Sequence, residues 1–213
     1  MSGILNVLGM AVAFAAFYII LVQVNYDLNF NKGIKDSEKI FVMSSGSLDG
    51  GDKRQIHFCR PLAEVILQSS PNIECGGVLN FVGAGSISLW KDDGGSRQDF
   101  SINLTSVSGT ALKAAGFEAV AGSLDEVTLR NTFAVSETVA EKFGLEVGMQ
   151  VFSDGDYPCS IVAIYKDMPD NSHFKYVEAV HNIMDSGIDN YSEWSYQYLV
   201  KVYDPSQVDQ MEK

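Results

Sequence analysis

The sequence predicts an α+β protein (mixed α/β) in which one membrane helix precedes a soluble domain of short strands and helices. Residues 4–24 carry no charged side chain, which indicates the helix. Beyond them, apolar runs of strand length alternate with helical segments that have capping residues, a pattern typical of mixed folds. The 213 residues, 46% of them hydrophobic, are enough for one ordinary domain or two small ones.

The apolar segment is long enough to cross a bilayer. As a helix, residues 4–24 span about 31 Å, which matches the hydrocarbon core. A cleaved secretory signal is the competing interpretation, but the start is not basic and no small-x-small cleavage site follows. We therefore expect a transmembrane helix over residues 1–24 and a soluble domain over residues 25–213. Three lysines follow the helix and nothing basic precedes it, so the positive-inside rule alone would place the soluble domain in the cytoplasm.

The first half of the soluble domain alternates strands with helices. Pro61 opens a helix in its first turn, where the missing N–H of proline is tolerated. Apolar and polar residues alternate over 100–105, so Ser101, Asn103 and Thr105 are expected on a solvent-facing side. The predicted elements are strand 40–43, the helix from residue 61, strands 73–82, 86–90 and 100–105, and helix 110–115, which ends at Gly116.

The second half contains a strand–helix unit. Residues 132–135 form the strand, Ser136 caps the helix that follows, and Gly144 ends it. Residues 157–165 include a stretch that is apolar on both faces, as expected of a central strand. The last predicted elements are a strand with Tyr196, Tyr198, Val200 and Val202 on one face, and a helix that begins at Asp204-Pro205.

Composition excludes several functions. The net charge of −12 argues against binding to a nucleic acid, since such proteins concentrate lysine and arginine. Three cysteines exclude a disulfide scaffold. A helix separates Cys59 from Cys75 and places them beyond disulfide reach, so any bridge would involve Cys159. Three buried or free thiols are the favoured expectation.

One cluster in the sequence has the residue types of a catalytic site. Pro-Asp-Asn-Ser is strong turn chemistry, however, and adjacent serine and histidine side chains in an extended segment point to opposite faces. We therefore expect a structural turn and no catalytic residue. The residues concerned are Asp167, Pro169, Asn171, Ser172 and His173.

No other pattern predicts a cofactor or metal site. His57 and His181 lack partners at metal-ligand spacing, and the segment from Gly83 to Gly85 has no capped helix after it, so it predicts a turn. The acidic loops do not have the spacing of a calcium-binding loop, and we expect them to be solvated. Their residues are Asp49, Asp52, Asp92 and Asp93. We expect no cofactor in this chain.

Several segments, in order, resemble the extracytoplasmic core domain of MacB/FtsX-like ABC transporter permeases. Residues 5–16 resemble the first membrane helix of that family, and 25–43 resemble the entry into its outer domain. Residues 134–144 and 160–176 are similar to a strand–helix stretch and the turn that follows it. Residues 61–63 with 70–74 resemble the first helix of the domain and its exit.

The resemblance implies a two-lobed extracytoplasmic domain, with a βαβ-like lobe and a strand-rich insertion within roughly residues 75–130. It implies the inner (cytoplasmic) membrane, with residues 25–213 on the periplasmic side. The implied partners are a cytoplasmic ABC ATPase, a second permease copy (homodimer or paralogue), and an extracytoplasmic partner or substrate. This chain lacks the family's basic leader and its later membrane helices, so we expect it to be a fragment.

The resemblance implies a permease subunit that does not itself hydrolyse ATP. In it, the outer domain would couple ATP-driven motion to export, substrate release or activation of a partner. The alternative is a single-span, membrane-anchored extracytoplasmic module for binding or assembly, without an ATPase. An anchored hydrolase is a third interpretation, which replacement of His173 by alanine would test.

Overall fold

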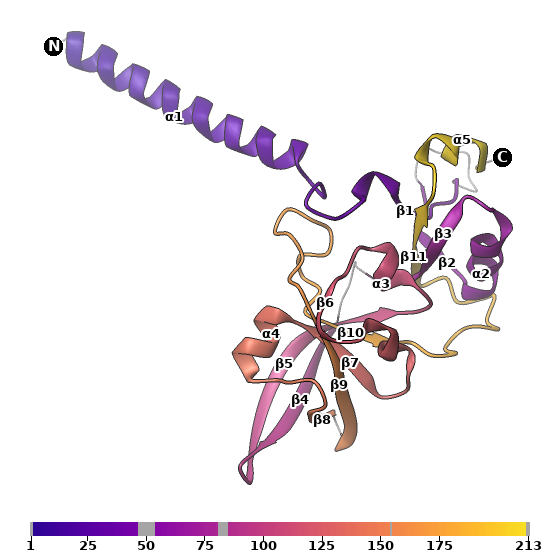
Figure 1. Ribbon diagram of the computed structural model, residues 1–213. Helices are drawn as coiled ribbons and strands as arrows, with labels where there is room; N and C mark the ends of the chain where they lie inside the picture. Colours follow the sequence, from indigo (N-terminus) through magenta and orange to yellow (C-terminus); the bar gives the residue numbers. More distant parts are fainter. Residues whose placement is uncertain (1, 47–53, 81–84, 154, 212–213) are drawn as a thin grey trace.

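The computed structural model describes residues 2–46, 54–80, 85–153 and 155–211. Its first element, α1 (Ser2–Leu28), projects away from the folded domain as a single straight helix (Figure 1). Within the described residues, one helix is long and apolar enough to cross a membrane, Gly3–Leu28, and none of it is buried by the rest of the chain. The helix predicted over residues 1–24 is therefore present and extends to Leu28.

The smaller of two sheets is built around the last strand of the chain. β11 pairs antiparallel with three other strands, and α2 packs against this sheet. The segments that form this lobe come from both ends of the domain. They are η1 (Ser37–Lys39), β1 (Ile40–Val42), β2 (His57–Phe58), α2 (Arg60–Ser69), β3 (Ile73–Val78), β11 (Tyr196–Val202), η3 (Pro205–Gln207) and α5 (Val208–Met211).

The larger sheet has seven strands in the order β6-β9-β7-β10-β5-β4-β8. Because β8 pairs with β9 as well as with β4, the strands from β9 round to β8 close into a barrel. Figure 1 shows this barrel below the smaller lobe. Its strands are β4 (Gly85–Asp93), β5 (Ser96–Val107), β6 (Ala119–Gly122), β7 (Thr132–Ser136), β8 (Gln150–Ser153), β9 (Tyr157–Tyr165) and β10 (Ala179–Asn182).

The predicted strand–helix unit is present. β7 runs parallel to β9, and α4 (Glu137–Phe143) lies between them in sequence. The Ser136 side chain accepts a hydrogen bond from the Val139 N–H, and Gly144 ends the helix at a φ of 59°. The other short helices are α3 (Ala111–Ala114) and η2 (Leu124–Thr128).

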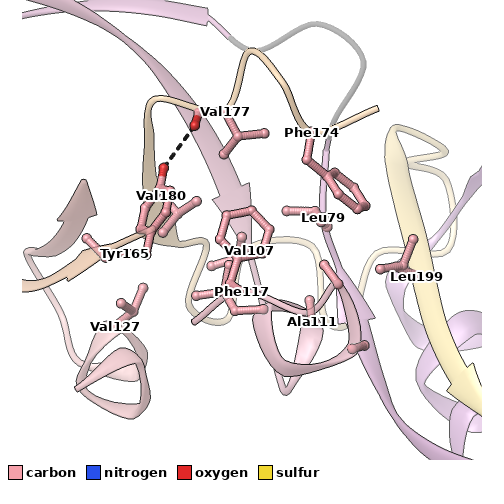
Figure 2. Packing of buried hydrophobic residues seen from close by; sticks show 14 of the residues in the cluster. Leu79, Val107, Ala111, Phe117, Val127, Tyr165, Phe174, Val177, Val180 and Leu199 are labelled. Carbon is pink, nitrogen blue, oxygen red and sulfur yellow. Dashed lines mark hydrogen bonds between the residues drawn. The ribbon is translucent and has the colours of Figure 1, made fainter. Parts of the chain in front are cut away.

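Two main apolar clusters hold the domain together. One fills the barrel and includes Leu89 and Ile102. The other is a central core, to which both sheets contribute; Figure 2 shows Leu199 from the smaller lobe on one side of it and Tyr165 from the barrel on the other. The buried Tyr165 hydroxyl donates a hydrogen bond to the Val177 carbonyl at 3.0 Å, which satisfies its polar group inside the core.

Several predicted boundaries differ from the structure. The strand predicted over residues 73–82 ends at Val78, and its last two positions lie outside the described residues. Thr105 was expected on a solvent-facing side of β5 but is completely buried. The reason is that the end of β5 packs where the barrel meets the smaller lobe: Leu79 forms a bridge with Val107, which lies on the same side of β5 as Thr105. Residues 75–130 supply β3 to the smaller sheet and β4, β5 and β6 to the larger one, whose other strands come from residues 132–182.

Candidate functional site

The five residues singled out in the sequence lie in the loop between β9 and β10. This loop packs against the segment that leaves α1, and Figure 1 shows it in orange next to the end of that helix. We call the contact between residues 26–34 and residues 167–174 the junction. It is the place where a membrane helix would be attached to the folded domain.

Backbone and asparagine groups form the centre of the junction. The Asn31 N–H donates to the Asn171 carbonyl at 2.8 Å, and the Asn171 side-chain amide donates to the Asn29 carbonyl at 2.8 Å. The Asn31 side-chain oxygen accepts from the His173 N–H at 3.0 Å. Asn31 has a φ of 62°, a left-handed conformation that asparagine tolerates better than most residues. Three hydrogen bonds therefore tie residues 29–31 to residues 171–173.

The loop is also held from within. The Ser172 hydroxyl donates to the Pro169 carbonyl at 2.7 Å and accepts from the Phe174 N–H at 3.3 Å. Asp167 accepts from the backbone N–H and the hydroxyl of Thr138, at the start of α4. A methyl group added at Gly33 would lie 2.8 Å from a Pro169 side-chain carbon, so a side chain there would force the two segments apart.

These contacts are those of a structural turn. The Ser172 hydroxyl is bonded to the backbone of its own loop, and the His173 ring lies edge-on to Phe30, with the ring centroids 4.8 Å apart. The structure thus brings all five motif residues into one loop, in which Ser172 bonds to the loop backbone and Asp167 to Thr138.

The junction is anchored in the central core. Ile34 follows the asparagine contacts and is only 6% exposed, and Phe174, on the loop, is 4% exposed; both belong to the core cluster that contains Leu199. Next to Ile34, an ion pair at 2.7 Å joins Asp36 to Lys201 of β11. The hydrogen bond from Lys201 lowers the pKa of Asp36 and raises that of Lys201. The segment after α1 is therefore bonded to the loop, the core and the smaller sheet.

Sequence reasoning identified the loop but missed its partners. Asn29, Asn31 and Ile34 carry no catalytic or metal-binding signal, and the contacts of the two asparagines with the loop span 142 positions in the chain. The Asn-Lys-Gly sequence at residues 31–33 is a local turn signal. It does not indicate what the turn contacts.

The other sequence candidates have ordinary structural surroundings. His57 bonds to Gln197 and His181 to Ser106. Asp92 accepts from the Gly95 N–H within the β4–β5 hairpin, while Asp49, Asp52, Gly83 and Ala84 lie outside the described residues. The cysteines at 59, 75 and 159 are free and buried. In the part of the chain that the structure describes, no group of three His, Cys, Asp or Glu side chains is arranged to hold a metal.

The junction and the two lobes can now be compared with known proteins. The profile of the MacB-like periplasmic core domain matches residues 4–213. The chain belongs to this family. No curated protein matches the sequence, so the family assignment rests on the profile and on solved structures.

The fold is shared by solved structures, among them three with the following similarity to this chain. A domain of a putative permease protein from Porphyromonas gingivalis is 19% identical, with a TM-score of 0.64 over 81% of this chain and 80% of the other. The periplasmic region of MacB from Actinobacillus actinomycetemcomitans is 14% identical, with a TM-score of 0.54 over 85% and 83%. The extracellular domain of the noncanonic ABC-type transporter YknZ from Gram-positive bacteria is 13% identical, with a TM-score of 0.51 over 81% and 86%. The predicted two-lobed α+β fold and its resemblance to MacB/FtsX-like permeases are confirmed.

Proposed function

We propose that this chain is the first membrane helix and outer domain of a permease subunit in an ABC transporter of the MacB type, and that the junction transmits motion between the two. In this proposal a separate cytoplasmic ATPase binds and hydrolyses ATP, and the permease works as a dimer of identical or paralogous subunits. The membrane is the inner membrane, with residues 25–213 on its periplasmic side.

The observation that carries the proposal is the rigid attachment of α1. A helix that moves as a lever transmits displacement only if the segment after it is fixed to the domain that must move. Here the hydrogen bonds of Asn31 and the burial of Ile34 fix that segment within six residues of the end of α1, at Leu28. The outer domain itself would release a substrate or activate a partner when its two lobes are displaced.

Association with an ATPase is the first test. The protein, tagged at its native locus and extracted gently from membranes, should co-purify with an ABC ATPase and with a second permease copy. Purification of the tagged protein without any ATPase would contradict the proposed transporter function and favour a membrane-anchored module for binding or assembly.

Coupling is tested by weakening the junction in the assembled transporter. The double variant Asn31→Ala and Asn171→Ala should keep ATP hydrolysis and lose most of the transport that depends on it. The matched control is Asn103→Ala, a half-buried asparagine on β5 in the barrel. Equal transport by the junction and control variants would contradict transmission through the junction. His173→Ala should lower stability only; loss of a hydrolytic activity would support the hydrolase interpretation instead.

A further inference from the structure

The junction presents an exposed aromatic and basic surface beside α1. Its side chains are Tyr26, Phe30, His173, Lys175 and Tyr176, which we call the collar. Tyr26 and Phe30 contact each other, and Phe30 contacts His173. The Lys175 ammonium group lies 5.5 Å from the centre of the Tyr176 ring. Tyr176 is 71% exposed, although the loop around it is firmly held.

The position of the collar relative to the bilayer follows from the point at which the apolar segment of α1 ends. The apolar segment ends at Val24, and Tyr26 lies about 3 Å farther along the helix axis, at the level where the hydrocarbon core gives way to headgroups. The Tyr26 hydroxyl donates to the Asp170 carbonyl at 3.1 Å, and the side chain of Asp170 pairs with Lys175 at 3.6 Å. The first contact holds the loop at the same depth as the end of the helix, and the second holds Lys175 beside Asp170 in that loop.

The net charge of the residues around the junction is more favourable for contact with an anionic membrane surface than the net charge of the rest of the chain. The junction together with the residues that flank it, 26–35 and 166–176, carries four lysines and three aspartates, whereas the whole chain has a net charge of −12; three of the lysines, Lys35, Lys166 and Lys175, are among the flanking residues. An anionic bilayer repels acidic surface, so segments with a small excess of lysine approach it more readily than the acidic remainder does. Exposed tyrosines with lysines beside them are the side chains that settle among headgroups.

We propose that the loop between β9 and β10 rests on the membrane and that the collar binds phospholipid headgroups of the bilayer crossed by α1. The aromatic rings lie among the headgroups, and Lys175 pairs with phosphate. This contact would hold the domain at a fixed angle to the membrane. Movement of α1 would then displace the domain, because the domain could not rotate freely about the segment that follows the helix. The inference rests on α1 crossing a membrane, which the proposed function shares, and needs no ATPase.

The test uses the full chain in nanodiscs of phosphatidylcholine and phosphatidylglycerol, with and without lipid that carries a nitroxide on its headgroup. Tyr176→Trp places a fluorescent reporter in the collar. Tyr191→Trp is the matched control, because Tyr191 is 68% exposed but lies in the loop before β11. The emission of the parent chain, from Trp90 and Trp194, is subtracted from both.

The reporter at position 176 should lose about half of its emission to the headgroup label, and the reporter at 191 almost none. Adding Lys175→Glu to Tyr176→Trp should reduce the quenching. If the chain enters the discs and quenching is equal at the two positions, the collar does not bind headgroups, while the proposed transporter function is unaffected. Quenching unaffected by Lys175→Glu overturns the role of that lysine. A chain that fails to enter the discs overturns the membrane span and the proposed function with it.

Discussion

The barrel and the smaller lobe are assembled in opposite ways. Every strand of the barrel comes from the continuous stretch 85–182, and its interior is filled by a cluster of its own. The smaller lobe joins residues near 40–78 to residues near 196–211, and it packs on a central core that it shares with barrel strands and with Ile34. The segment after α1 contacts both units: Asn31 bonds to the loop between barrel strands β9 and β10, and Asp36 pairs with Lys201 of β11 in the smaller lobe.

The largest expected effect separates the two cores. Leu79 in the central core and Leu89 in the barrel are both almost fully buried, so either change to alanine should cost about 2–5 kcal/mol of unfolding free energy. Leu79→Ala should shift the unfolding of both lobes equally, whereas Leu89→Ala should shift the barrel more.

Trp90 lies in the barrel and Trp194 stacks on Phe58 in the smaller lobe, so each lobe has its own fluorescent probe. Urea unfolding followed with one tryptophan at a time, the other replaced by phenylalanine, makes the comparison. Equal shifts of both probes by Leu89→Ala would show that the barrel interior is not a separate unit.

The next effect concerns the anchor of α1. Ile34→Ala should cost about 2–4 kcal/mol, and Ile34→Val about 1 kcal/mol, because the smaller change leaves most of the buried side chain in place. Hydrogen exchange should show faster exchange of amides at residues 31–37, with the strands of the barrel still protected. Uniform loss of protection across both lobes would contradict a local role for this anchor.

A smaller effect is expected at Asn31. Asn31→Ala removes the acceptor for the His173 N–H and places a side chain without local hydrogen bonding at a φ of 62°, at a combined cost of about 2 kcal/mol. The amide of His173 should exchange at least about tenfold faster. Asn31→Asp keeps both the acceptor and the tolerance of that φ, so it should behave almost like the parent. A similar loss in both variants would mean that the hydrogen bond is not what holds the junction.

The smallest effect is a difference in pH dependence between the two regions. Asp36 has a pKa lowered from 3.8 by its hydrogen bond with Lys201, so its contribution to stability is present above pH 3.8 and is lost as the pH falls through the lowered value. Burial lowers the pKa of His181 on β10 from 6.5, so its contribution is present above pH 6.5 and is lost as the pH falls through that lowered value.

Melting temperatures between pH 3 and pH 8 measure both contributions. Asp36→Asn should flatten only the most acidic part of the profile, and His181→Gln only the part that begins below pH 6.5. If Asp36→Asn changes the melting temperatures just below pH 6.5, or His181→Gln changes only those at the most acidic pH, the assignment of these two groups is wrong.

The sequence by itself determined the elements that depend on near neighbours. The apolar segment of α1, the cap at Ser136, the end of α4 at Gly144 and the apolar run of β9 all follow from residues within a few positions of one another. The resemblance to the MacB/FtsX-like family came from such local segments in order. Strands of two to four residues, such as β2, β6, β8 and β10, were missed because they are too short to show a period.

Only the tertiary structure decided which segments meet. Thr105 is buried on the side of β5 that alternation marks as polar, because that side, which also carries Val107, packs on the central core outside the barrel. The junction depends in the same way on contacts between Asn29, Asn31 and the loop at 171–173, which are 142 positions apart in the chain. Hydrogen bonds to backbone groups leave no pattern in side-chain chemistry. The sequence therefore indicated only a turn at residues 167–173, and the fold showed that this turn is bonded to the segment that follows α1.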